Sequence, residues 1–296
     1  MEIRPRVMRT RGFTLLELLV VLVITGILAA TVVVFFKPAI SSYFDAKRRA
    51  SLTDMADTAL RRMGRDVRSA VPNSVRIPNN QCFEIVPTSG GGRYRTAPNT
   101  VSDDAGPTCT PTHSCPLDIT QPVLQFDSLS QLPVTPAVND WVVIGNQNSN
   151  DVYAGTTSAA FSSISTPNAA FGLHRISLQA LKQFPSGYTG GRFVIVPNNG
   201  GNPSVFYVCS GAGGPDAQGN GTGTLFRLTR AFNAAYPAAC PAGGDILATR
   251  VRSCNFIYDP NQGATQQSGF VWMQLELTEA NETVSISYGA HVDNVP

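Results

Sequence analysis

The feature that most constrains this 296-residue chain is a nearly uninterrupted apolar run close to its N-terminus. Phe13 to Phe36 make up 24 residues, and Glu17 is the only charged one among them. A helix of that length spans about 36 Å, at about 1.5 Å per residue, which is enough to cross the hydrocarbon core of a bilayer. The run therefore predicts a single membrane-spanning helix ahead of most of the chain.

The residues before this run are basic. Residues 1–12 contain four arginines, at positions 4, 6, 9 and 11, and one acidic residue, Glu2. Positive charge next to a spanning helix stays on the cytoplasmic side of the membrane. We therefore expect a cytoplasmic N-terminus and, on the outer side of the inner membrane, a periplasmic body.

Three interpretations of this N-terminus compete. A cleaved secretory signal peptide fits the basic start, but the apolar part of such a peptide has about 7–15 residues. A plain signal anchor explains the span and leaves Glu17 unexplained, because an acid at mid-membrane costs about 2.5–3.5 kcal/mol on insertion scales. In the third interpretation, cleavage between Gly12 and Phe13 creates a new α-amino group one helical turn before Glu17. In a low-dielectric environment that amine and the Glu17 carboxylate of a neighbouring helix attract strongly, which would fix the register of packed helices.

Read as a whole, "RGFTLLELLVVLVITGILAATVV" resembles the class III signal of type IV prepilins and type II secretion pseudopilins. The resemblance implies cleavage after Gly12 by a prepilin peptidase, N-methylation of Phe13, and an assembly role for Glu17. It also implies the partners: that peptidase, other major and minor pilin subunits contacted through the N-terminal helix, and an inner-membrane assembly platform. The membrane would hold the subunit only until its extraction into a pilus or pseudopilus.

Residues 37–71 predict a second, amphipathic half of the same helix. Its apolar positions recur at spacings of three and four, as one buried helix face requires; they are Leu52, Met55 or Ala56, Ala59 or Leu60, Met63 and Val67. Pro72 disfavours helical geometry at Val71 and ends the helix there. Arg61, Arg62, Arg65 and Arg68 are interpreted as a solvated or subunit-facing edge.

Residues 72–296 change to short strand-like runs separated by turn residues, with long loops at 87–120 and 210–223. The predicted strands are 74–77, 82–86, 123–126, 141–145, 192–196, 205–209, 225–229, 254–258, 269–277 and 283–292. Clean alternation in the last two strands, around "EANE", predicts a hairpin, and 177–183 is a candidate second helix. The expected fold is α+β, with the long helix packed on a mostly antiparallel sheet. Its parts would be a leader (1–12), a transmembrane and assembly helix (13–36), the amphipathic half (37–71) and a periplasmic β-rich domain (72–296).

All six cysteines follow the apolar run, which favours an oxidising compartment for the body. Six cysteines allow 15 pairings, and the sequence does not select among them. Cys109 and Cys115 are close enough to close a small loop, and they form the one specific pair we propose. The alternative for "CTPTHSC", a zinc site with His113, would require reduced thiols and a fourth ligand.

No arrangement of residues in the sequence indicates catalysis. The three histidines, at 113, 174 and 291, fall in no hydrolase, zincin or redox pattern, so we expect neither an enzyme nor a cofactor. The glycine-rich 210–223 lacks the ending of a phosphate loop and is interpreted as a flexible hairpin tip. Residues 146–155 lack the bidentate glutamate of a calcium loop, so no metal site is assigned. Basic residues interleaved with aromatic ones are also absent, which argues against nucleic acid as a partner.

The body resembles the minor pilins of mannose-sensitive haemagglutinin (MSHA) pili in four stretches. These are 57–77, 82–87, 192–196 and 288–296, and in layout the chain is similar to J-type minor pseudopilins. The resemblance implies a low-copy subunit that starts or caps a fibre, and a body of about 225 residues suits such an end position. A secretion pseudopilin and a tip adhesin, binding through 97–120 or the glycine-rich loop, remain the alternatives.

Overall fold

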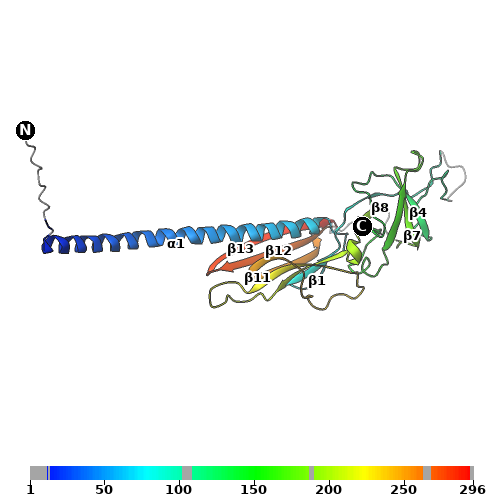
Figure 1. Cartoon of the computed structure of the whole chain (residues 1–296). Helices are drawn as coiled ribbons and strands as arrows, with labels where there is room; N and C mark the ends of the chain where they lie inside the picture. The colour runs from blue at the N-terminus through cyan, green and yellow to red at the C-terminus, as the bar shows by residue number, and fades with distance from the viewer. Residues whose placement is uncertain (1–11, 13, 102–108, 187–189, 263–267, 294–296) are drawn as a thin grey trace, which may run out of the picture. The chain divides into compact units, whose positions relative to one another are not determined.

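The chain consists of one long helix followed by strands. The computed structural model describes residues 12, 14–101, 109–186, 190–262 and 268–293. The chain divides after Ala50 into two compact units. Helix α1, Leu15–Arg68, begins in the first unit and ends in the second, which holds all the strands (Figure 1). The predicted α+β class, with a long N-terminal helix and antiparallel sheets joined by long loops, is confirmed.

One sheet of the second unit has seven strands in the order β1-β2-β9-β10-β11-β12-β13, each pair antiparallel. Its strands are β1 (Arg76–Asn79), β2 (Cys82–Ile85), β9 (Ser204–Ser210), β10 (Gly223–Arg230), β11 (Asp245–Gln262), β12 (Ser268–Glu279) and β13 (Glu282–Asp293). All seven overlap strands predicted from the sequence.

The other sheet has six strands in the order β3-β8-β5-β6-β7-β4, again antiparallel throughout. Its strands are β3 (Gly90–Arg93), β4 (Val123–Ser128), β5 (Trp141–Val143), β6 (Ser158–Ser165), β7 (His174–Lys182) and β8 (Arg192–Val196); a 3₁₀ turn, η1 (Asn199–Gly201), follows β8. A bridge between Tyr94 and Ser128 joins its two outer strands. The N–H of Leu129 also donates to the Arg93 carbonyl at 2.8 Å, so the sheet closes on itself as a small barrel.

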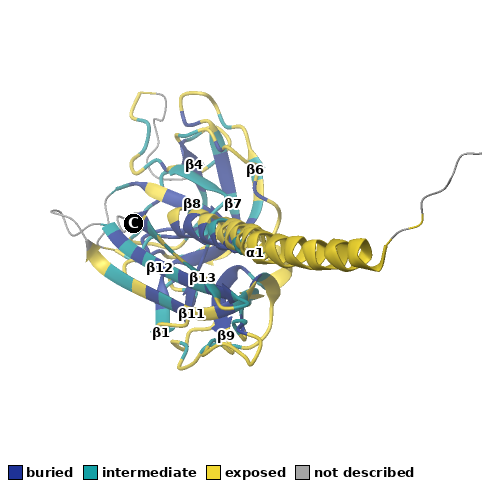
Figure 2. Cartoon of the chain, turned by 90° about the vertical axis from the view of Figure 1, so that its left-hand side faces the viewer, coloured by how far each residue is buried: buried dark blue, intermediate teal, exposed yellow. Residues whose placement is uncertain are grey.

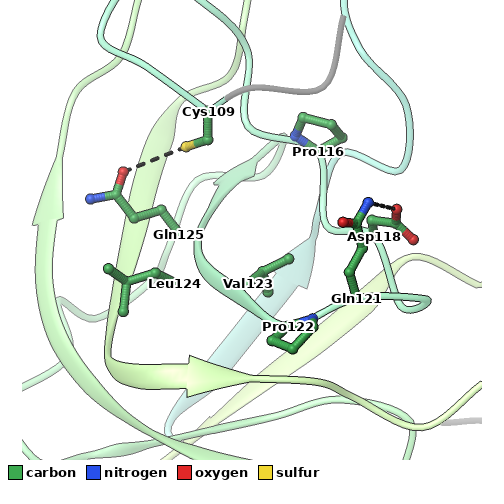
Figure 3. Close-up of a pocket in the computed structure, with 8 residues that line it drawn as sticks. All are labelled: Cys109, Pro116, Asp118, Gln121, Pro122, Val123, Leu124 and Gln125. Atoms are coloured by element: carbon green, nitrogen blue, oxygen red, sulfur yellow. Dashed lines mark hydrogen bonds between the residues drawn. The ribbon is translucent and has the colours of Figure 1, made fainter.

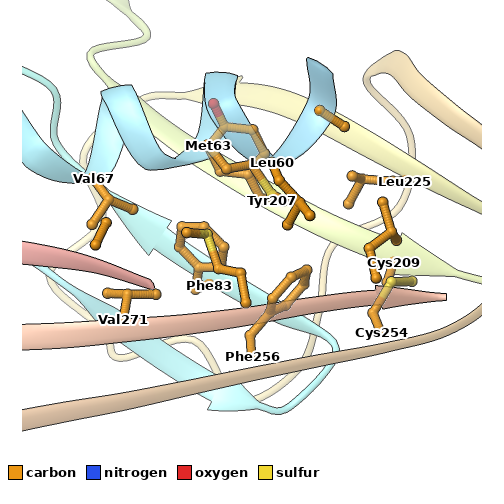
Figure 4. Close-up of a cluster of buried hydrophobic side chains, with 14 of the residues drawn as sticks. Leu60, Met63, Val67, Phe83, Tyr207, Cys209, Leu225, Cys254, Phe256 and Val271 are labelled. Atoms are coloured by element: carbon orange, nitrogen blue, oxygen red, sulfur yellow. A yellow bond between two sulfur atoms is a disulfide. The ribbon is translucent and has the colours of Figure 1, made fainter. Parts of the chain in front are cut away.

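The second half of α1 supplies one wall of the main core. Its buried side chains are Leu52, Ala56, Ala59, Leu60, Met63 and Val67, which confirms the amphipathic face read from the sequence. They pack on the inner face of the seven-stranded sheet, where Phe83, Tyr207 and Phe256 form a cluster of rings (Figure 4). Leu60 and Met63 are fully buried. The helix here is therefore part of the domain's core as well as its link to the first unit.

A polar contact fixes this half of the helix to the sheet. Tyr207 donates its hydroxyl to Asp66 Oδ2 at 2.6 Å, and Arg227 Nη2 lies 3.2 Å from the same oxygen. Burial and the neighbouring Asp66 charge raise the pKa of Tyr207, so its hydroxyl stays a donor. The three side chains come from α1, β9 and β10, and thus tie the end of the helix to two strands.

The predicted hairpin around "EANE" is present. β12 and β13 pair in register from Glu279 with Glu282 to Ser268 with Asp293, without a bulge. The two linking residues, Ala280 and Asn281, have φ of 49° and 67°, as a type I′ turn requires.

The prediction of a helix at 177–183 is wrong, since these residues belong mainly to strand β7. Leucine, alanine, glutamine and lysine in "SLQALKQ" all favour helices when taken alone. In the fold, β7 pairs with β4 on one side and β6 on the other. Sheet pairing on both edges overrides the local preference.

Two further strands, β3 and β6, were not predicted, and neither was the division into two sheets. β3 is "GGGR", a composition that ordinarily weakens strands. Here the backbone approach is close: a Cβ at Gly91 would overlap the carbonyl oxygen of Phe193, and one at Gly90 would lie 2.9 Å from Pro133. Glycine at these positions is therefore required by packing that the sequence does not display.

Leu60→Ala should lower the free energy of unfolding by about 2–5 kcal/mol, because it leaves a cavity where helix and sheet meet. Urea denaturation of the full-length chain in detergent, followed by tryptophan fluorescence, measures the change. Arg62→Ala, on the exposed face of the same helix, is the matched control and should shift stability by less than about 0.5 kcal/mol. Equal effects of the two substitutions would contradict the assignment of this face to the core.

Candidate assembly site at the start of the long helix

The first turn of α1 is capped by Thr14. The N–H of Glu17 donates to Thr14 Oγ1 and the N–H of Leu18 to the Thr14 carbonyl, both at 3.2 Å. Thr14 is therefore the N-cap, which satisfies donors that a helix start leaves unpaired. Gly12 is exposed, and Phe13, the predicted methylation position, lies outside the described residues. The predicted cleavage junction thus directly precedes the N-cap.

Glu17 is the third residue of α1 and the acid in its first turn. With Thr14 it makes the Thr-x-x-Glu pattern of a capping box. A negative charge here also faces the positive end of the helix dipole, which contributes about 0.3–1 kcal/mol at exposed sites. This second role went unnoticed in our reading of the sequence, although "TLLE" carries the signal. Glu17 is thus placed both to stabilise the helix start and to meet a positive group from outside.

The first half of α1 exposes its apolar side chains on all sides (Figure 2). Leu15 is 84% exposed and Phe36 60%. The helix is long and apolar enough to span a membrane, and its most apolar stretch is not buried by the described part of the chain. Apolar surface of this extent requires lipid or other apolar helices as its surroundings.

The hydroxyl groups inside this segment are satisfied within the helix. Thr25 donates to the Val21 carbonyl at 2.7 Å, and Thr31 to the Leu28 carbonyl at 2.8 Å. Side-chain hydroxyls bonded in this way add little polarity to the helix surface. Among the described residues from 14 to 36, Glu17 is the only charged group. A second helix that packs against this segment would therefore meet a single charge, at one position along the helix axis.

The predicted arginine edge lies on the exposed face of the second half of α1. Arg61 pairs with Asp57 at 2.6 Å, and Arg68 donates to the Tyr288 hydroxyl at 2.7 Å while lying over that ring. Arg62 and Arg65 are exposed. Two of the four arginines are thus partly engaged with their own domain, and the other two lie open to solvent.

Every cysteine is in a disulfide: Cys82–Cys240, Cys109–Cys115 and Cys209–Cys254. The 109–115 pair is the one that we singled out from spacing, and a bridged pair cannot serve as thiolate ligands for zinc. A buried ion pair holds this loop: Arg175 binds Asp127 at 2.7 Å and donates to the His113 carbonyl at 2.7 Å. The N–H of Cys115 donates to Asp127 at 2.6 Å. This ion pair was not predicted from the sequence, because Asp127 and Arg175 lie 48 residues apart.

A groove of about 510 Å³ lies beside the disulfide loop (Figure 3). Its walls are mainly proline and aliphatic side chains, with the carboxylate of Asp118 at one end; the lining residues are Cys109, Pro116, Asp118, Gln121, Pro122, Val123, Leu124 and Gln125. Asp118 accepts hydrogen bonds from Thr120 and Gln121, which lower its pKa and already engage its oxygens. The groove therefore offers shape and apolar surface, with little free polar chemistry.

The two polar loops use their side chains internally. In 146–155, Asn146 donates to the Pro72 carbonyl at 2.6 Å and accepts from Thr157 at 3.0 Å. In the β9–β10 connection, Asp216 accepts the N–H of Gln218 and of Asn220, so this loop is a hydrogen-bonded tip. No group of three or more metal-ligating side chains occurs among the described residues.

Comparison with known protein families gives a match at the N-terminal end of the chain. The family described as prokaryotic N-terminal methylation motif matches residues 7–33, which include Gly12, Phe13 and Glu17. This motif is the type IV pilin-type prepilin signal; it implies processing by a prepilin peptidase, membrane anchoring by a single pass and assembly with other pilins. A search of curated proteins and a search of solved structures each found no match.

Thr14→Ala should destabilise the first turn by about 1 kcal/mol, because it removes the side-chain acceptor at the N-cap. Hydrogen exchange of the Glu17 amide, in the uncleaved chain in micelles, should then be about fivefold faster. Thr14→Ser keeps the hydroxyl and should exchange as the parent does. Unchanged exchange in Thr14→Ala would show that Thr14 does not cap α1.

Proposed function

We propose that this chain is a minor pilin of the MshO type, which initiates or caps an MSHA-type pilus. The main support is the match to the N-terminal methylation motif at the start of α1. The apolar surface of that helix is exposed, and Glu17 is the only charged residue among described residues 14–36. The four arginines of the predicted leader favour an inner-membrane orientation with the N-terminus on the cytoplasmic side. Three disulfides favour a periplasmic body.

The proposed role is structural and not enzymatic. Before assembly, the apolar half of α1 sits in lipid, and after extraction the corresponding helices of other subunits cover the same surface. Moving between two apolar surroundings changes the solvation of the leucine and valine side chains little. Glu17 is the group that distinguishes the two states, because lipid offers its carboxylate no cation and a methylated amine of a neighbouring helix does.

An end position in the fibre is supported by the size of the body. The β-rich part, residues 72–296, carries two sheets in about 225 residues, a bulk that a tightly repeating lattice must accommodate at every step. A minor subunit of a type II secretion pseudopilus has the same N-terminal chemistry and is the second candidate.

The first test is the mature N-terminus. We expect cleavage between Gly12 and Phe13 and methylation of the Phe13 amine, read by mass spectrometry of protein purified from a strain that carries prepilin peptidase. Gly12→Val is the matched control and should retain the leader. A Cβ at Gly12 meets no atom within 4 Å, so a block of cleavage would not reflect misfolding. A different mature N-terminus, or an unmodified amine, would refute the processing assignment.

The second test separates the two roles of Glu17. Glu17→Gln keeps a side chain suited to the capping box but loses the charge, whereas Glu17→Ala loses both. If the carboxylate pairs with the Phe13 amine of a neighbour, both variants should be cleaved yet fall at least about tenfold in sheared fibres, since 1.4 kcal/mol is a factor of ten. Immunoblots of fibre and membrane fractions measure this. Wild-type fibre levels in Glu17→Gln would show that capping alone matters.

A further inference from the structure

A cavity of about 320 Å³ lies on the face of the seven-stranded sheet opposite α1. Residues 231–241 form a strap across this face, and the Cys82–Cys240 disulfide fastens the strap to β2. The Tyr236 hydroxyl closes the strap on the sheet edge, accepting from the N–H of Ile77 at 2.9 Å and donating to its carbonyl at 3.3 Å. The cavity is lined by Arg76, Glu84, Arg230, Asn233, Ala235, Tyr236, Pro237, Ala238, Ala239 and Pro241.

Arg76 is a fully buried cation in the wall of this cavity. Its guanidinium lies 3.4 Å from the Tyr153 ring centroid, and Nη1 donates to the carbonyl of Asn233 at 2.9 Å. Nη2 has no hydrogen-bond partner, although it is buried. A buried guanidinium N–H left without an acceptor is destabilising, because the group has lost its hydrogen bonds to water. Arg76 thus does more than hold the strap; it places a buried positive charge in the cavity wall.

The charges around the cavity do not balance. Glu84 lies 3.5 Å from Arg76 and is the only carboxylate among the lining residues. Burial raises the pKa of Glu84, and the two nearby arginines oppose that shift. Arg230 is the second cation of the lining; its guanidinium lies 5.1 Å from the Phe206 ring centroid. Two cations and one carboxylate leave the lining with an excess of about one positive charge.

We propose that this cavity binds a small organic carboxylate. The carboxylate would accept hydrogen bonds from the Arg230 guanidinium, a donor suited to carboxylates, with the buried Arg76 as a second positive charge in the wall. Tyr236, 47% exposed, and the prolines of the strap give the rest of the ligand an apolar and aromatic wall. The volume is near the lower limit of small-molecule pockets, which fits a ligand the size of one sugar acid or one amino acid. This site is independent of the assembly role of α1.

The test uses the mature full-length protein in detergent micelles and isothermal titration calorimetry. Two arms distinguish the source of the carboxylate: D-glucuronate against neutral D-glucose, and N-acetyl-L-alanine against neutral N-acetyl-L-alaninamide, which lacks the carboxylate. We expect one of the two carboxylates to bind and its neutral counterpart not to bind. Arg230→Gln should weaken that Kd by about tenfold or more, the effect of losing about 1.4 kcal/mol.

Arg252→Gln is the matched control, because it makes the same charge change at an arginine that is 44% exposed, pairs with Glu276 and does not line the cavity. It should leave the Kd unchanged. The proposal is overturned if neither carboxylate binds at about 10 mM, a concentration above even weak millimolar affinities. It is equally overturned if the neutral compounds bind as well, or if Arg230→Gln and Arg252→Gln bind alike.

Discussion

Helix α1 runs without a break from an exposed apolar segment into the core of the β-rich domain, and the rest of the structure depends on this single helix. Over its first half, apolar side chains cover every side, and nothing in the part of the chain that the structure describes buries them. Over its second half, the buried apolar side chains lie on one face of the helix, from Leu52 to Val67, and pack against the seven-stranded sheet to complete its core. The β-rich domain therefore cannot give up the helix without losing a wall of its core. Whatever holds the first half in a membrane or a fibre also holds the domain.

The helix start shows how a single residue can serve two purposes. Thr14 and Glu17 form a capping pattern that stabilises the first turn without any partner chain. The same geometry keeps the Glu17 carboxylate at the start of a helix that otherwise has no charge up to Phe36. An apolar surface gives strong but undirected association, because the hydrophobic effect has no preferred register. In the proposed assembly, one charge at a fixed position along the helix would supply the register, since a mismatched pairing would leave a carboxylate unpaired in low dielectric.

Features that depend on local periodicity were predictable from the sequence. The buried stripe of α1 and the β12–β13 hairpin follow from spacings of three to four and of two. Features that depend on distant partners were not predictable. The residues of β7 have helical preferences, and they form a strand because β4 and β6 pair with its two edges. The glycines of β3 were predicted to lie in a loop, and they form a strand that packs closely against Phe193 and Pro133. Among the cysteines, a separation of six residues suggested one bridge, whereas Cys82–Cys240 spans 158 and had no local signal. The site at the helix start was readable because all of its parts lie within six residues, Gly12 to Glu17.

The two faces of the seven-stranded sheet differ in character. The face toward α1 is filled with aliphatic and aromatic side chains, and Tyr207 contacts Asp66 at its border. The opposite face carries Arg76, Glu84 and Arg230 beneath a strap that Cys82–Cys240 holds in place. Buried charges of this kind cost desolvation energy that an apolar face avoids, and they weaken a fold when they remain unbalanced. Arg76 is compensated in part by the Asn233 carbonyl and the Tyr153 ring, and the excess positive charge that remains is what the proposed carboxylate would balance.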